Sequence, residues 1–359
     1  MELLPDLPPL ASPAPVFVPD ATYGVVRGVG GDELTSAGVR LLMVNAFHLL
    51  RSPGVTRVNA LGGLATMMGF PGLVMTDSGG FQAYSLIREN ARFGTITKNG
   101  LTFVSPDGAK VKLTPERAIV NQRRLGADIA FCLDDCTHAD DPSEEQRLSV
   151  DRTLAWARRC KDEFTKSLGD LIGEPDRPRL FAVVQGGRDE VLRRRCAEEL
   201  LEIGFDGYGF GGWPLDGDGN LLIDTFALLR ELIPAEFSLH ALGVGHPVSI
   251  ARCFELGYAT FDSSLPTRDA RRGRLYRFRD GAPSLSGDWF EKVYLRDDVH
   301  QRSRAPISDE CHCVACTHYS LGYLNHLLRR DEPLLLRLAT LHNLTFMRQV
   351  TDLLAAPAA

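Results

Sequence analysis

The sequence predicts an α/β protein of the (β/α)8, or TIM-barrel, class. Short apolar runs alternate with helical stretches along most of the 359 residues, which is the pattern of parallel strands joined by crossover helices. Most runs end in Asp, Asn, Gln or Gly, and in a barrel the carboxyl ends of the strands converge on the face that carries the active site. An open doubly wound sheet is the alternative, but no G-x-G-x-x-G follows the first strand.

The strands are expected where apolar runs are continuous, because parallel strands are buried on both faces. In chain order these runs are 39–47, 72–80, 129–136, 179–187, 206–213, 238–245 and 258–264, with 15–20 as an eighth. Helices fill the intervals, and the best-marked one begins after Thr114. This threonine is a typical N-cap, Pro115 suits the first helical position, and Gly126 follows the end.

Composition is that of an ordinary globular protein, with 44% hydrophobic and 24% charged residues. No apolar run approaches the roughly 20 residues that cross a membrane. The proline-rich N-terminus lacks the basic region of a signal peptide, so a cytoplasmic protein is expected. The net charge of −6 argues against nonspecific nucleic-acid binding, although a local basic patch remains compatible with it. Such a patch follows Asp262, with arginines at 268, 271, 272, 274, 277 and 279.

Three carboxylates close predicted strands: Asp77, Asp134 and Asp262. A carboxylate at a barrel strand end can attack a sugar carbon, move a proton or accept hydrogen bonds from a base. Each could equally cap a helix or join a structural ion pair. Asp77 is followed by Ser-Gly-Gly and then Phe81, which offers a flat face to a planar ligand or belongs to the core.

A cysteine cluster near the C-terminus predicts a metal site. Cys311, Cys313 and Cys316 are spaced C-x-C-x2-C, and His342 lies 26 residues further on. Three thiolates and one imidazole make a closed tetrahedral structural zinc site. The fourth ligand stays open at this point, because three other histidines lie nearby: His312, His318 and His326.

Several long segments together resemble one family, the tRNA-guanine transglycosylases, or queuine/archaeosine tRNA-ribosyltransferases. They run in order along nearly the whole chain: PVFVPDATYGVVRGV, VNAFHLLRSPG, TDSGGFQAYSL, FVSPDGAKVKLTPERAIVNQRRLGADIAFCLDDC, FAVVQGG, ALGVGHP, FDSSLPTRDARRG and CHCVACTHYSLGYLNHL. The family fold is a (β/α)8 barrel with a small C-terminal zinc-binding subdomain, which agrees with the strand ends and the cysteine cluster.

The resemblance implies a role for individual residues. Asp262 matches the nucleophile that attacks the ribose C1′, and Asp77 matches the general acid/base. The positions that match hydrogen-bond contacts to the base edge are Ser78, Asp134, Gln185 and Gly212. The positions that match the two apolar side chains between which the base is sandwiched are Phe81 and Leu242. The zinc ligands match Cys311, Cys313, Cys316 and His342. Arginines that fall in the RNA-handling segment or extend it are Arg268, Arg271, Arg272 and Arg274.

One segment departs from the family pattern. Residues 211–217 read GGWPLDG, where family members that use queuine or its aminomethyl precursor carry GGLAVGE- or GGLSGGE-like stretches. Trp213 and Pro214 replace small or aliphatic residues, and Gly217 stands at the glutamate position, for which Asp216 or Asp218 are candidate substitutes. The departure leaves the identity of the inserted base open.

The resemblance implies a pentosyltransferase that replaces guanine by a 7-deazaguanine at the anticodon wobble position of tRNA, through a covalent Asp–ribose intermediate. Two alternatives remain: a paralogue that acts on DNA, and a non-catalytic RNA-binding subunit. A homodimer is expected from the family. The expected organisation is a tail (1–14), a catalytic barrel (15–290), a zinc-binding helical subdomain (291–350) and a second tail (351–359).

Overall fold

Eight parallel strands form the centre of the protein, in a computed structural model that describes residues 14–104, 108–279 and 283–356. The strands are β1 (Val16–Pro19), β2 (Leu41–Val44), β3 (Leu73–Thr76), β7 (Ile129–Phe131), β8 (Arg179–Val184), β9 (Gly207–Phe210), β10 (Ser238–Ala241) and β11 (Thr260–Ser263). They pair in the order β1-β11-β10-β9-β8-β7-β3-β2. The two ends of this sheet meet where Ala21 N–H donates to the Met43 carbonyl at 2.7 Å. The predicted barrel and all eight predicted strands are confirmed.

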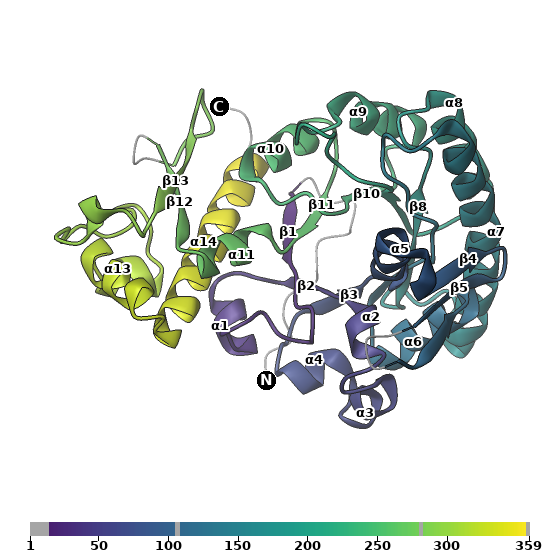
Figure 1. Ribbon diagram of the computed structural model, residues 1–359, viewed down its shortest axis with the longest axis horizontal. Coiled ribbons are helices and arrows are strands. Elements are labelled where there is room, and N and C mark those ends of the chain that lie inside the picture. Colours follow the sequence, from purple (N-terminus) through teal and green to yellow (C-terminus); the bar gives the residue numbers. More distant parts are fainter. Residues whose placement is uncertain (1–13, 105–107, 280–282, 357–359) are drawn as a thin grey trace.

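Helices surround the strands (Figure 1). They are α1 (Gly31–Ser36), α2 (Ala46–Leu49), α3 (Val55–Ala60), α4 (Gly63–Met68), α5 (Gly80–Glu89), α6 (Pro115–Leu125), α7 (Ser143–Leu168), α8 (Glu190–Ile203), α9 (Ile223–Leu232), α10 (Pro247–Glu255) and α11 (Leu265–Arg271). Helix α6 begins as predicted, because the Thr114 side chain accepts a hydrogen bond from Arg117 N–H and Pro115 follows it.

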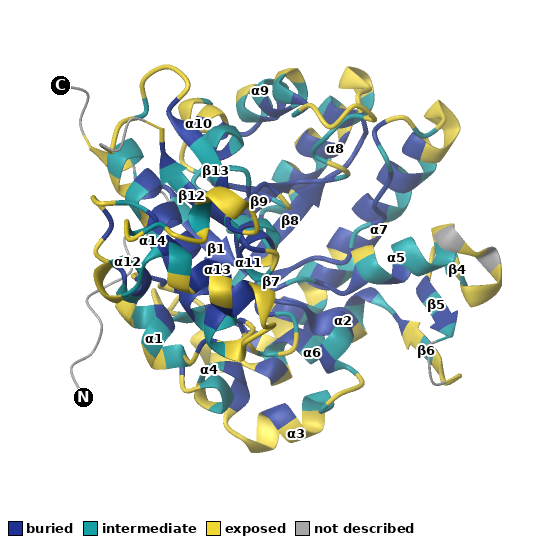
Figure 2. Cartoon of the chain, turned by 60° about the vertical axis from the view of Figure 1, so that its left-hand side comes forward, coloured by how far each residue is buried: buried dark blue, intermediate teal, exposed yellow. Residues whose placement is uncertain are grey.

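Apolar side chains fill the inside of the barrel. They include Val18, Leu41, Met43, Met75, Ile129, Phe131, Phe181 and Val183. A larger apolar layer lies between the strands and the outer helices, so both strand faces are buried, as Figure 2 shows. Within the described residues, no helix is long and apolar enough to span a membrane.

A three-stranded antiparallel sheet interrupts the barrel pattern after α5. Its strands are β4 (Gly94–Thr97), β5 (Gly100–Val104) and β6 (Lys110–Leu113). This sheet was not among the elements predicted from the sequence. Its signal is nevertheless present, because Asn99-Gly100 separates two β-branched runs, and Asn-Gly is a typical hairpin turn.

The C-terminal region combines a two-stranded sheet with three helices. These are β12 (Arg274–Phe278), β13 (Phe290–Tyr294), α12 (Val314–His318), α13 (Leu321–Arg329) and α14 (Pro333–Ala355). The region has its own apolar cluster, which includes Leu275, Leu324 and Leu338. The limits expected at residues 290 and 350 stay a prediction. Of the expected tails, 1–13 and 357–359 lie outside the described residues.

Helix α14 joins this region to the barrel (Figure 1). It packs against α11, β12 and β1. Its buried Asn343 donates from Nδ2 to the Pro266 carbonyl of α11 at 2.9 Å and to the Arg274 carbonyl at 3.0 Å, and its Oδ1 accepts from Tyr276 N–H at 3.0 Å. One side chain therefore binds the helix and the strand that directly follow β11.

Candidate active site and metal centre

Asp262 lies at the end of β11 with its side chain 17% exposed. Its Oδ1 accepts two hydrogen bonds, from Gly243 N–H at 3.0 Å and from His240 Nε2 at 2.9 Å. Among the described residues, Oδ2 has no hydrogen-bond partner. This leaves one oxygen of the carboxylate held by the protein and the other available to a ligand.

Asp77 follows β3 and accepts four hydrogen bonds. Oδ1 accepts from Ala46 N–H at 2.8 Å and Gly79 N–H at 3.1 Å, while Oδ2 accepts from Asn45 Nδ2 at 2.7 Å and Gln82 Nε2 at 3.2 Å. The contact from Gly79 N–H comes from a turn in which Gly79 has a φ of 78°, a value that residues other than glycine rarely adopt. Burial nevertheless raises the pKa of Asp77 to about 7.

Asp20 directly follows β1 and is a third carboxylate of this site, one that was not among the residues predicted from the sequence. Burial and, to a smaller extent, the nearby charge of Asp262 raise its pKa to about 6. Asp20 in turn contributes to the raised pKa of Asp77. The signal was available, because the run at 15–20 also ends in an aspartate.

Asp134 and Gln185 form a second polar pair, on the loops after β7 and β8. Gln185 Nε2 donates to Asp134 Oδ2 at 2.7 Å, and burial raises the pKa of Asp134 to about 6. The Oε1 atom of Gln185 is buried and has no hydrogen-bond partner within the described part of the chain, which is costly unless a ligand or water supplies a donor. Gly212 lies beside this pair with φ 89°, and a Cβ there would approach Gln185 Oε1 at 3.6 Å.

The remaining residues expected to touch the base, Phe81, Leu242 and Ser78, differ in how far they are buried. Phe81 is 39% exposed, and its ring centroid lies 5.6 Å from that of Trp213. Leu242 packs with the barrel interior. Ser78 is buried, and its hydroxyl accepts from Gly80 N–H at 3.2 Å, at the start of α5.

The segment 211–217 borders the same site. Trp213 also has its ring centroid 6.1 Å from that of His138, and a Cβ on Gly243 would lie 3.7 Å from Pro214. Asp216 caps its own turn, because its Oδ1 accepts from the N–H groups of Asp218 and Asn220. Trp213 therefore lies between the rings of Phe81 and His138, whereas the Asp216 carboxylate is engaged in the turn.

The arginines after Asp262 fall into two groups. Arg268 and Arg272 are exposed and Arg271 is half-buried, and no ion pair forms at these three among the described residues. Burial lowers the pKa of the Arg271 guanidinium, and three neighbouring cations lower it further: Arg27, Arg268 and Arg272. The next three form ion pairs instead: Arg274 with Asp269, Arg277 with Glu291 and Arg279 with Asp288.

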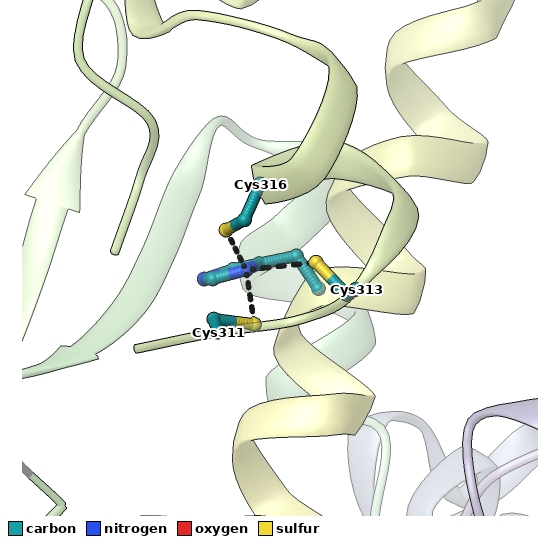
Figure 3. A group of neighbouring side chains, drawn as sticks. Cys311, Cys313 and Cys316 are labelled. Atoms are coloured by element: carbon teal, nitrogen blue, oxygen red, sulfur yellow. Dashed lines mark hydrogen bonds between the residues drawn. The ribbon is translucent and has the colours of Figure 1, made fainter. Parts of the chain in front are cut away.

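Four side chains of the C-terminal region form a group that could hold a metal ion. The ligand atoms of Cys311, Cys313, Cys316 and His342 all lie within 4.8 Å of one another. The three sulfurs lie 3.7, 3.4 and 3.4 Å from His342 Nδ1 (Figure 3). The other nitrogen, Nε2, lies 2.7 Å from the Tyr276 carbonyl, the type of outer contact that orients a ligating imidazole. The other three candidate histidines are exposed: His312, His318 and His326.

Comparison with known proteins gives a consistent result. The sequence profile of the family described as "TGT: Queuine tRNA-ribosyltransferase" matches residues 9–354. The chain is 36% identical over 338 residues to a queuine tRNA-ribosyltransferase of Novosphingobium aromaticivorans, covering 94% of this chain and 85% of that one. Proteins of the same name from Methylacidiphilum infernorum (35% identity, 95% and 88% covered) and Symbiobacterium thermophilum (36%, 96% and 81%) are similarly related.

Proposed function

Because the chain belongs to the queuine tRNA-ribosyltransferase family, we propose that it is a pentosyltransferase that exchanges guanine for a 7-deazaguanine at the wobble position of tRNA. The observation that carries the proposal is the joint position of Asp262 and Asp77, which both interact with the charge of Asp20. One carboxylate has a free oxygen, and the other has a pKa near neutrality. These are the requirements of a nucleophile and of a general acid/base.

In the proposed reaction, Asp262 Oδ2 attacks the ribose C1′ of the target nucleotide while the C1′–N9 bond breaks. Asp77, protonated, gives its proton to the departing guanine. A 7-deazaguanine then enters, loses its N9 proton to Asp77 and attacks C1′, which releases the Asp262 carboxylate. One glycosidic bond replaces another, so no energy source is needed.

The rest of the site suits a flipped-out base. Asp134 accepts hydrogen bonds, Gln185 Oε1 lacks a donor, and Phe81 offers a ring face. Edge contacts and stacking are how proteins hold an extruded base. Arg268, Arg271 and Arg272 would bind phosphates beside it. In this proposal Ser78, Gly212 and Leu242 shape the pocket.

We further propose that the Cys311, Cys313, Cys316 and His342 group holds one structural zinc ion. Three thiolates and one imidazole fill all four positions of tetrahedral zinc, so the ion would support the fold and leave no position for substrate. A homodimer and a cytoplasmic location stay predictions.

The direct test is exchange of labelled guanine into purified tRNA, with duplex DNA in parallel and with guanine, queuine and the aminomethyl precursor offered separately. Exchange into tRNA alone is expected. Exchange into DNA alone would identify the chain as a DNA-modifying paralogue. Tight tRNA binding with neither exchange nor a covalent adduct would indicate a non-catalytic subunit.

The two half-reactions should depend on pH in opposite directions. Asp77 must be protonated when guanine leaves, so the single-turnover rate of adduct formation should fall as pH rises through about 7. It must be ionised when the new base enters, so release should slow as pH falls through the same value. Rapid-quench measurements between pH 5 and 9 check this. Asp77→Asn should remove both inflections, and inflections that persist in this variant would contradict the assignment.

Trp213 should influence which base is inserted. Trp213→Leu removes the ring contact with Phe81, which is worth about 0.5–1.5 kcal/mol for an aromatic pair. We expect kcat/KM for guanine to fall about 2- to 10-fold, and for bases with a bulky 7-substituent to fall less, because the site widens. Tyr294→Leu, which changes an exposed aromatic residue elsewhere, is the control. An equal change for all bases would contradict a role in selection.

Arg268→Ala and Arg271→Ala should each flatten the salt dependence of tRNA binding. Loss of one phosphate contact reduces the slope of log K against log salt by about one unit. Arg277→Ala is the matched control, since Arg277 is already paired with Glu291. Affinity measurements between about 50 and 300 mM salt check this. An unchanged slope in both variants would show that Arg268 and Arg271 make no phosphate contact with the tRNA.

A further inference from the structure

His240 connects the proposed nucleophile to the interior of the barrel. It is fully buried on β10, and its ring centroid lies 5.3 Å from that of Phe131. Nε2 lies 2.9 Å from Asp262 Oδ1, and Nδ1 lies 2.8 Å from Thr260 Oγ1. Thr260 is the register partner of His240 on β11, and Asp262 is two residues further along that strand. Residues two apart share a strand face, so the imidazole reaches both.

The partners determine which nitrogen carries a proton. An ionised carboxylate only accepts hydrogen bonds, so Nε2 must be the donor to Asp262. In the neutral ring, Nδ1 then accepts from the Thr260 hydroxyl, which has no other acceptor among the described residues. A neutral imidazole therefore satisfies both hydrogen bonds of this chain: Thr260 O–H donates to His240 Nδ1, and His240 Nε2–H donates to Asp262 Oδ1.

This arrangement distinguishes the two oxygens of Asp262. His240 Nε2–H and Gly243 N–H both donate to Oδ1, which leaves Oδ2 to form the bond to C1′. When the ester forms, Oδ1 becomes its carbonyl oxygen and loses negative charge. When the C1′–Oδ2 bond breaks, the charge returns. Donors on Oδ1 bind the charged carboxylate more strongly than the neutral ester.

We propose that His240 is a positioning residue for Asp262: it selects Oδ2 as the attacking atom and promotes release of the carboxylate from the ribosyl ester. The proposal rests on the covalent mechanism proposed above. It assigns His240 mainly to the second half-reaction, because a donor that stabilises the carboxylate favours the bond-breaking step that regenerates it. The same donor raises the barrier of the first half-reaction, because it stabilises the charged carboxylate that is consumed there.

The test compares His240→Phe with His240→Gln. Phenylalanine keeps a planar ring and removes the donor, whereas glutamine keeps an N–H donor near the Nε2 position. For His240→Phe we expect the release rate to fall about ten-fold, as for loss of one hydrogen bond to a charged group. Release then limits turnover, so kcat and the KM for tRNA should fall together, kcat/KM for tRNA should change little, and the adduct on denaturing gels should increase. His240→Gln should restore much of the release rate.

A merely structural role predicts something else. His240→Phe leaves the Thr260 hydroxyl without its partner, so a lower unfolding temperature is expected in either case, and Thr260→Val added to His240→Phe removes that cost. If kcat/KM falls as much as kcat in both variants and no extra adduct appears, His240 only supports the fold and the proposal is overturned. If wild-type protein exchanges bases but forms no adduct, the covalent mechanism itself fails, which is a separate outcome.

Discussion

Asp262→Asn should lower guanine exchange into tRNA by at least about 10³-fold, because the amide cannot form the ribosyl ester that carries the sugar between the two bases. The substitution keeps the size of the side chain, and its amide oxygen can still accept from His240 and Gly243. Folding should therefore be close to normal. The measurement is incorporation of labelled guanine, together with a denaturing gel that detects protein-bound RNA.

The control for this variant is Asp288→Asn, which changes an exposed aspartate paired with Arg279. It should exchange at the wild-type rate. Binding of tRNA to Asp262→Asn should also be retained, since phosphate contacts supply most of the affinity. An adduct in Asp262→Asn would show that another carboxylate forms the bond, and Asp20, which interacts with the charge of Asp262, is the candidate.

His342→Ala should have the largest effect on stability. It removes one of four ligands from a group that is otherwise closed, and structural zinc contributes about 10–16 kcal/mol of apparent binding free energy in small zinc-dependent domains. With the proposed zinc bound, part of that free energy would stabilise the C-terminal region, so we expect loss of bound zinc and a lower unfolding temperature. Metal analysis by emission spectrometry and thermal unfolding with and without chelator are the measurements.

Matched controls come from the same segment. His312 lies between two of the cysteines and His318 lies just beyond the third, yet both are exposed. His312→Ala and His318→Ala should keep about one zinc per chain and the wild-type unfolding temperature. Full zinc content in His342→Ala would mean that another residue completes the site.

The barrel was predictable because its signals are local. Each strand is a continuous apolar run, and the polar residue at its end marks the face on which the proposed catalytic residues lie. The sheet formed by β4, β5 and β6 was missed because two of its strands, β4 and β6, are half-exposed and lack the continuous apolar runs by which the barrel strands were found. Asn99-Gly100 was its only strong signal.

The site was predictable only in part, for a different reason. Asp77 and Asp262 stand out because each closes an apolar run of the sequence. His240 lies inside the run SLHALGVG, where a histidine looks like an ordinary core residue. The role proposed for His240 depends on the register of β10 against β11, which places His240 beside Thr260. Strand register is a property of the folded sheet, and a single sequence does not reveal it.

The contacts of Asn343 limit where this protein can be truncated or recombined with a relative. Asn343 directly follows His342, one of the proposed zinc ligands. Its side chain holds the backbone of α11 and β12 on either side of Arg268, Arg271 and Arg272. A barrel cut off before α14, or grafted onto a foreign C-terminal region, would lose these contacts beside its proposed nucleophile. The C-terminal region is therefore not an exchangeable module. We expect recombination between relatives to be tolerated only when α14 and the segment 262–278 are inherited together.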